Sequence, residues 1–233
     1  MKNFFGKLKS FTRNQRLIQK DIYSNQLMIN LSSMGKYFPV SGSSLNMHSL
    51  ATMINDVVIN DRKQIVEFGA GLSTLYVARL IHSLNLETRV ISIDDNQGWL
   101  DLMKDRLEDE GLSPYVQFVF GPLAPCSHAK QGLEWYDEQA VIKALQDCST
   151  PVDSVLVDGP MAFEKSKGLA RYPALPVANP FLNDQYAIFL DDMHRDGEQA
   201  IIKEWSKLNQ LEFRKVNPVF SLAQRGEGFN PVV

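Results

Sequence analysis

The sequence predicts an α/β fold with a mostly parallel sheet, a closing antiparallel hairpin and a helical appendage at the N-terminus. From residue 64 onward, short apolar runs alternate with helical patterns, which is typical of a parallel sheet covered by helices on both faces. A glycine turn, Gly69-Ala70-Gly71, follows the first of these runs. Near the end, runs 211–216 and 219–224 are separated only by Asn217 and Pro218. So short a linker cannot make a parallel crossover, and these two strands must therefore pair antiparallel.

The chain is expected to divide into an N-terminal helical and lid segment, residues 1–44, and a main domain, residues 45–233. One helix of the main domain has apolar residues at helical spacing and is expected to pack on the sheet: Leu50, Met53, Ile54, Val57 and Val58. Residues 31–44 contain Gly35, Pro39, Gly42 and five serines, which predicts a mobile loop or lid.

The remaining elements follow from periodicity and capping. Strands are predicted over residues 64–68, 89–94, 115–120, 152–157 and 186–190, with helices over 73–84 and 138–145. Asn96 can cap the helix after the second strand. In the last helix Ile201, Trp205 and Leu208 are expected to share one buried face.

Composition and charge narrow the class of partners. The 233 residues are 44% hydrophobic and 22% charged, which is ordinary for a globular protein. Residues 1–20 hold six basic and no acidic side chains, and the remainder holds 18 basic and 27 acidic groups, a balance of −9. So acidic a body argues against a nucleic-acid partner. The basic N-terminus, which also carries Phe4, Phe5, Leu8 and Phe11, could lie on an anionic membrane. The favoured interpretation is a helix packed on the body or on a second copy, as in a homodimer.

The cellular setting is inferred from the cysteines and from apolar runs. Cys126 and Cys148 fit neither a disulfide framework nor a zinc pattern, so reduced thiols are expected. No run reaches the roughly 18 apolar residues of a membrane span. Lys7 and Lys9 interrupt what would be a secretory apolar region. A cytoplasmic protein without a transmembrane segment is expected.

The stretch from Glu67 to Ser73 is the strongest candidate for a cofactor site. Gly69 and Gly71 are expected to let the backbone turn sharply and approach a ligand, with Ala70 between them. The amides at the start of the next helix can donate to that ligand. A carboxylate at Glu67 would repel a pyrophosphate but attract an ammonium or a sulfonium. The turn therefore favours S-adenosylmethionine over NAD.

An acidic residue closes the second strand, about 20 residues beyond the glycine turn. Asp94, with Asp95 after it, is suited to binding the two hydroxyls of a ribose. The alternative is that Asp94 only caps the helix that follows Asn96.

Together these motifs resemble the class I S-adenosylmethionine-dependent methyltransferases, and more narrowly the bacterial small-molecule, O-methyltransferase-like members. The resemblance rests on Glu67-Phe-Gly-Ala-Gly-Leu-Ser, on Asp94, and on the segments Val-Asp-Gly-Pro (157–160), Arg-Tyr-Pro-Ala-Leu-Pro (171–176) and Leu-Asp-Asp-Met-His-Arg-Asp-Gly-Glu (190–198). It implies a Rossmann-like, seven-stranded sheet over roughly residues 45–225. Ser73 stands where the family motif has a third glycine, and Gly121-Pro122 where many relatives have an acid that contacts adenine.

The candidate residues for activating the methyl acceptor follow the fourth and fifth predicted strands. Asp158, Asp191 and Asp192 are expected at adjacent strand ends, where three carboxylates could hold Mg²⁺. The resemblance extends to metal-dependent catechol-type O-methyltransferases, although Asp192 stands where those have Asn. The alternative is that Asp191 and Asp192 bind neighbouring backbone and Arg195.

A base for the acceptor is sought among the same strand ends. Asp158 is one candidate, and it is also placed among the cofactor-binding residues. His194 is another, because its pKa is ordinarily near neutral. Arg171 could clamp an anionic acceptor or pair with a local acid, and Trp135 and Tyr136 could line the pocket or be simply packed.

The predicted function is methyl transfer from S-adenosylmethionine to a small-molecule or glycan-type acceptor, with oxygen as the favoured acceptor atom. Two alternatives remain from the sequence. One is a non-catalytic binding module that keeps the fold. The other is a dinucleotide-binding Rossmann domain, against which Glu67 and the terminal hairpin argue.

Overall fold

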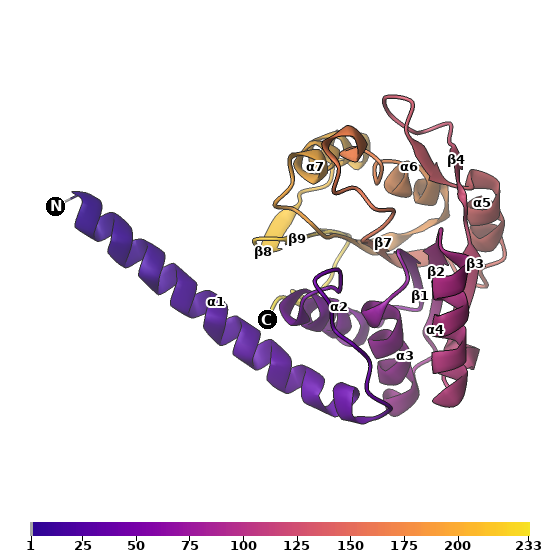
Figure 1. The fold of residues 1–233 in the computed structure, drawn as a ribbon, viewed down its shortest axis with the longest axis horizontal. Helices are drawn as coiled ribbons and strands as arrows, with labels where there is room; N and C mark the ends of the chain where they lie inside the picture. Colours follow the sequence, from indigo (N-terminus) through magenta and orange to yellow (C-terminus); the bar gives the residue numbers. More distant parts are fainter. Residues whose placement is uncertain (1) are drawn as a thin grey trace.

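The protein folds around one seven-stranded sheet with a helical layer on each face, as the computed structural model shows (Figure 1). The structure describes the backbone of residues 2–233 and the side chains of residues 15–233. The strand order is β3-β2-β1-β6-β7-β9-β8. Their bounds are β1 Gln64–Phe68, β2 Arg89–Asp94, β3 Val116–Phe120, β6 Val152–Val157, β7 Leu182–Leu190, β8 Arg214–Asn217 and β9 Phe220–Arg225. This is the predicted fold class, and it is confirmed.

The strand order reverses between β1 and β6. Five strands run parallel, and β9 pairs antiparallel with both β7 and β8. The hairpin expected around Asn217-Pro218 is therefore present. Since ligands bind at the carboxyl ends of strands where the order reverses, the ends of β1 and β6 mark the site to examine.

Alternate residues of the central strands face two separate cores. Ile65 and Leu156 pack with helices α2 (Met47–Ile59), α3 (Leu72–Leu84) and α4 (Gln97–Asp109). Val66 and Val155 pack instead with α5 (Glu138–Gln146), α6 (Ala174–Ala178) and α7 (Asp196–Asn209). Strands buried on both faces explain why most residues of the central strands are apolar.

The first helix, α1 (Lys2–Ser33), is anchored at one end only. Ser24, Met28 and Leu31 are buried against the body, and α1 lies beside α2 there. Its N-terminal part projects away from the sheet (Figure 1). The helix continues to Ser33, so the loop predicted from residue 31 begins slightly later.

The structure corrects several details of the expected elements. Val58 and Leu208 are 45% and 50% exposed, because each lies one residue from a buried position, Val57 or Asn209, and is therefore rotated about 100° toward solvent. A two-stranded hairpin, β4 (Leu123–Pro125) and β5 (Glu134–Tyr136), and the five-residue helix α6 were not expected. Strands of three residues and a helix of five are too short to show periodicity. Three short 3₁₀ helices span Ser113–Tyr115, Lys165–Lys167 and Asn179–Phe181.

Two further expectations concern cysteines and membranes. Cys126 and Cys148 are both free thiols. Among the described residues, no helix combines the length and apolarity needed to cross a bilayer.

Candidate functional site

The turn between β1 and α3 needs glycine at its first position and not at its third. Gly69 has φ of +100°, and a Cβ there would lie 2.9 Å from the backbone nitrogen of Gly159. The turn thus packs directly against the loop that follows β6. Gly71 has an extended backbone, with φ of 177°, and a Cβ there would meet no atom within 4 Å. The expectation that both glycines serve the sharp turn is therefore wrong for Gly71, which instead leaves open space in the cleft.

Glu67 supports this turn from behind. Its carboxylate accepts hydrogen bonds from the hydroxyls of Ser73, Thr74 and Ser92, and the Thr74 hydroxyl accepts in turn from the Gly71 amide. Burial raises the pKa of Glu67 to about 7, against the opposing effect of these hydrogen bonds. The Glu67 carboxylate is buried, and its oxygens already accept hydrogen bonds from three hydroxyls. Any effect of Glu67 on a ligand therefore acts through the shape of the turn.

Asp94 holds the other side of the same turn. One oxygen accepts from the Ala70 amide at 3.0 Å and the other from the Asn96 amide at 2.9 Å. Asn96 in turn caps α4 by accepting from the Trp99 amide, and the Trp99 indole donates to the Ala70 carbonyl at 2.7 Å. Burial raises the pKa of Asp94 above its ordinary value. The cap of α4 is therefore Asn96 and not Asp94, which binds the backbone amides of Ala70 and Asn96 and also lines the cleft.

A cleft runs across the carboxyl ends of the strands in two connected parts. The first, about 430 Å³, lies between the turn and the loop after α1. The second, about 370 Å³, continues to the loops after β6 and β7. Both parts share six lining residues: Ser43, Ser44, Gly69, Ala70, Trp99 and Asp158. Gly71 and Ser73 line the first part, and Asp94 and Asp95 line the second.

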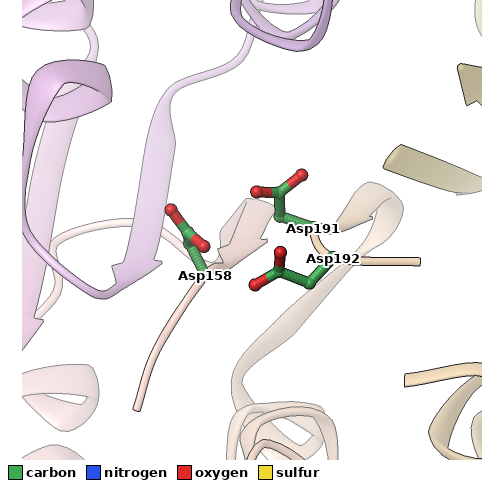
Figure 2. Close-up of side chains that lie close together, drawn as sticks. All are labelled: Asp158, Asp191 and Asp192. Carbon is green, nitrogen blue, oxygen red and sulfur yellow. The ribbon is translucent and has the colours of Figure 1, made fainter. Parts of the chain in front are cut away.

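Three carboxylates meet at the far end of the cleft (Figure 2). Asp158, Asp191 and Asp192 each offer an oxygen within 4.8 Å of the others. Burial, and then mutual repulsion, raises the pKa of Asp191 to about 8. Burial also raises the pKa of Asp158 to about 6, although the Arg171 guanidinium lowers it. An Asp191 oxygen is buried and has no hydrogen-bond partner among the described residues. These features are what a cation would relieve.

Two arginines already offset part of this charge. Arg171 is buried and lies 3.0 Å from Asp192 and 3.5 Å from Asp158. Arg195 lies 2.8 Å from Asp192, and both arginines approach the buried Glu198. When all four carboxylates are ionised, they carry two more charges than the two guanidinium groups offset. Of the two roles open for Arg171, pairing with local acids is the one that this geometry displays.

His194, Trp135 and Tyr136 differ in their position relative to the cleft. The His194 side chain is 54% exposed, lies 4.0 Å from Asp192 and is not among the residues that line the cleft. Trp135 is packed in the core, whereas Tyr136 lines the cleft. The Tyr136 hydroxyl is buried without a partner among the described residues, and burial raises its pKa well above the ordinary value.

Sequence reasoning missed several lining residues, namely Phe38, Trp99, Met161 and Phe163. The available signal for Trp99 was the capping residue Asn96, three positions earlier. Met161 and Phe163 are 68% and 65% exposed beside the acids, and nothing in a single sequence distinguishes them from packed residues.

Comparison with known proteins gives a family match and a set of similar structures. A family model described as a methyltransferase domain matches residues 66–193, more than half of the chain. No curated protein matches the sequence. The fold is similar to that of the O-methyltransferase TomG from Streptomyces achromogenes, solved with SAM, at 15% identity and a TM-score of 0.57, covering 89% of this chain and 96% of that one.

Two further structures are similar over comparable lengths. One is an O-methyltransferase from Bacillus cereus in complex with SAH, at 15% identity and a TM-score of 0.52, covering 90% of this chain and 91% of that one. The other is an SAH-bound methyltransferase from Podospora anserina, at 12% identity and a TM-score of 0.55, covering 91% of this chain and 88% of that one. At these identities the likeness concerns the fold.

Proposed function

Because the chain belongs to the family of methyltransferase domains, we propose that it transfers a methyl group from S-adenosylmethionine to an oxygen of a small-molecule or glycan-type acceptor. The family match confirms the resemblance found in the sequence and the enzyme class. The observation that carries the proposal is the cleft at the reversal point of the sheet. The glycine turn and Asp94 lie at one end, Asp191 and Asp192 lie at the other, and Asp158 lines both parts.

The cleft suits this cofactor in three respects. Gly71 leaves open space where a side chain would stand, so a ligand can approach the backbone. Asp94 and Asp95 supply carboxylates for a ribose diol. The buried Tyr136 hydroxyl is a donor without a partner among the described residues, and such a group is costly unless a ligand or water completes it.

Cofactor binding is tested by isothermal titration with S-adenosylhomocysteine. A micromolar dissociation constant is expected for the wild type, with loss of the signal in Asp94→Ala. Glu108→Ala removes one exposed carboxylate from α4 and is the matched control, with affinity expected to stay unchanged. Wild-type affinity in Asp94→Ala would remove Asp94 from the site, and no heat with the wild type would overturn the proposed cofactor.

Asp158 is the base that we propose for the acceptor. It lines both parts of the cleft, and its pKa of about 6 is near the range in which a carboxylate can accept a proton at neutral pH. The acceptor hydroxyl gives its proton to Asp158, and its oxygen bonds to the methyl carbon as the carbon–sulfur bond breaks. The electron pair of that bond remains on sulfur, so neutral S-adenosylhomocysteine is released. His194 is the second candidate, since it is close to Asp192 but lies outside the lining of the cleft.

The acid cluster also fits a divalent, oxygen-preferring cation. Asp158, Asp191 and Asp192 would hold it, and two unbalanced negative charges together with the unpartnered Asp191 oxygen support this assignment. A bound Mg²⁺ would supply Lewis acidity that lowers the pKa of an acceptor hydroxyl. Arg171 and Arg195 hold the carboxylates in place in either case.

The acceptor half is tested by release of S-adenosylhomocysteine from S-adenosylmethionine with a panel of hydroxyl, amine and carbon acceptors. Each reaction is run with Mg²⁺ and with EDTA. Turnover only with hydroxyl compounds, lost in Asp158→Asn, is expected. Turnover only with amines would overturn oxygen as the acceptor atom. Equal rates with Mg²⁺ and with EDTA would overturn the proposal that the reaction uses a divalent cation.

We also propose that the segment over residues 1–44 contributes a lid to the main domain at 45–233. Phe38, Ser41 and Ser44 line the cofactor part of the cleft. The buried Arg79 fixes one end of this loop by donating to the carbonyls of Leu31 and Lys36 while it pairs with Glu110. A lid held at its base can exclude water from the reacting groups without being rigid throughout.

A further inference from the structure

One face of α1 is apolar and exposed to solvent. Ile18, Ile22 and Ile29 are 57%, 52% and 57% exposed, and their spacing of four and seven residues places them in one stripe along the helix. The stripe that contacts the body is a different one, formed by Ser24, Met28 and Leu31. The exposed isoleucines are therefore not needed to attach α1 to the rest of the protein.

The exposed stripe follows a seven-residue repeat. Positions alternate by three and four residues as 15, 18, 22, 25 and 29, all of them exposed. In the sequence, the same spacing continues to Phe11, Leu8 and Phe4, whose side chains lie outside the described part. A narrow stripe with this period is the signature of a coiled-coil seam, in contrast to the wider apolar face of a helix that packs on a globular core.

We propose that these positions form a seam through which α1 pairs with α1 of a second copy, so that the protein is a coiled-coil homodimer. The seam, defined as residues 4, 8, 11, 15, 18, 22, 25 and 29, has polar residues only at Gln15 and Asn25. Isolated polar residues at such positions fix the register of paired helices. The proposal is independent of the methyl-transfer reaction.

The size and charge of α1 agree with this partner. A helix of 32 residues is about 48 Å long and 10 Å wide, so two such helices hide roughly 1,000 Å² in total, near the lower limit for a specific interface. At seven residues per repeat, Arg16 and Lys20 fall at outer positions, on the side of the helix away from the seam. Pairing therefore does not press these like charges together.

A membrane surface fits less well than a second copy. A helix that lies in a bilayer interface needs a broad apolar face, and Gln15 and Asn25 interrupt this one. Lys20, one of the basic residues of α1, donates to the Val233 carbonyl oxygen at 2.6 Å and is thereby engaged with the main domain.

Sedimentation velocity of the full chain without lipid tests the proposal. The wild type is expected at twice the 26.4 kDa of one chain. Ile18→Glu/Ile22→Glu is expected to sediment as a monomer. Tyr23→Glu/Leu27→Glu also replaces two exposed apolar residues of α1, but off the seam, and is expected to stay dimeric. Titration with S-adenosylhomocysteine checks that each variant keeps its fold.

Asn25→Ile gives a second measurement, because an apolar residue at this seam position is expected to tighten the dimer at least tenfold. A monomeric wild type would overturn the proposal. So would a dimer in which the seam and control variants behave alike, since the interface would then lie elsewhere. A monomer that co-sediments with anionic liposomes, and loses this in Ile18→Glu/Ile22→Glu, would identify the stripe as a membrane surface instead.

Discussion

The two ends of the cleft are built in opposite ways. At the cofactor end, Glu67 and Asp94 each have their oxygens occupied by hydroxyl or amide donors from within a few residues of the glycine turn or from the neighbouring strand. At the acceptor end, Asp158, Asp191 and Asp192 crowd one another, and only two arginines offset them. The first end is complete before any ligand arrives, whereas the second is arranged to gain from one.

This difference has a physical consequence for each end. A fully hydrogen-bonded network is rigid and holds the backbone in the geometry that a ligand requires. The conformational entropy of the turn is therefore lost on folding and not on binding. A crowded acid cluster raises the pKa of its members and stores unfavourable interaction that a cation or a proton can relieve. Substitutions at the two ends should therefore affect stability and binding in different proportions.

The largest effect on stability is expected at the acceptor end, from Arg171→Met. This change leaves four carboxylates with a single guanidinium and removes a bond to the Pro160 carbonyl. Breaking a buried ion pair costs about 3–5 kcal/mol in the free energy of unfolding. Urea denaturation at pH 7 measures it. Arg195→Met is the control and should cost less, because its side chain is 28% exposed against 4% for Arg171. Equal losses in the free energy of unfolding for the two variants would show that burial of the arginine does not determine its contribution to stability.

The two glycines of the cofactor end separate folding from binding. Gly69→Ala puts a Cβ against the Gly159 backbone at a positive φ, which should lower the free energy of unfolding by about 1–3 kcal/mol. Gly71→Ala meets no protein atom, so its melting temperature should equal that of the wild type while its affinity for S-adenosylhomocysteine falls. Thermal melts and titration calorimetry on both variants give the comparison. Unchanged binding in Gly71→Ala would mean that the cofactor does not approach this turn.

The acid cluster should also make stability depend on pH. Asp191 and Asp158 have folded pKa values near 8 and 6, raised above the ordinary 3.8, so the folded state holds more protons between these limits. Stability therefore falls as pH rises from about 4 to 8. Asp191→Asn should flatten this slope between pH 6 and 8, measured as melting temperature, and Glu108→Gln should not. Mg²⁺ should raise the melting temperature at pH 8 and not at pH 5, and an equal shift at both would contradict binding to ionised carboxylates.

The contrast between the two ends also explains what a single sequence reveals. Glu67, Gly69 and Asp94 lie within 28 residues and belong to one strand–turn–helix–strand unit, so their spacing predicts their arrangement. The approach of Arg171 to Asp192 depends on a long loop folding back over the sheet. Local periodicity carries no information on such a contact. For the same reason the strands and the closing hairpin were predicted, while the role of Gly71 and the lining residue Trp99 were not.

The smallest expected effect concerns Tyr136, which lines the same part of the cleft as Asp94 and Asp158. Tyr136→Phe keeps the ring that packs against Phe68 and removes only the unpartnered hydroxyl. Folding should therefore be unchanged or slightly favoured, since no protein hydrogen bond is lost. If the hydroxyl donates to bound cofactor, the dissociation constant of S-adenosylhomocysteine should rise by about 2–13-fold, the equivalent of one neutral hydrogen bond of roughly 0.5–1.5 kcal/mol. Titration calorimetry and a thermal melt on the same preparation distinguish this from a packing role, in which affinity would stay at the wild-type value.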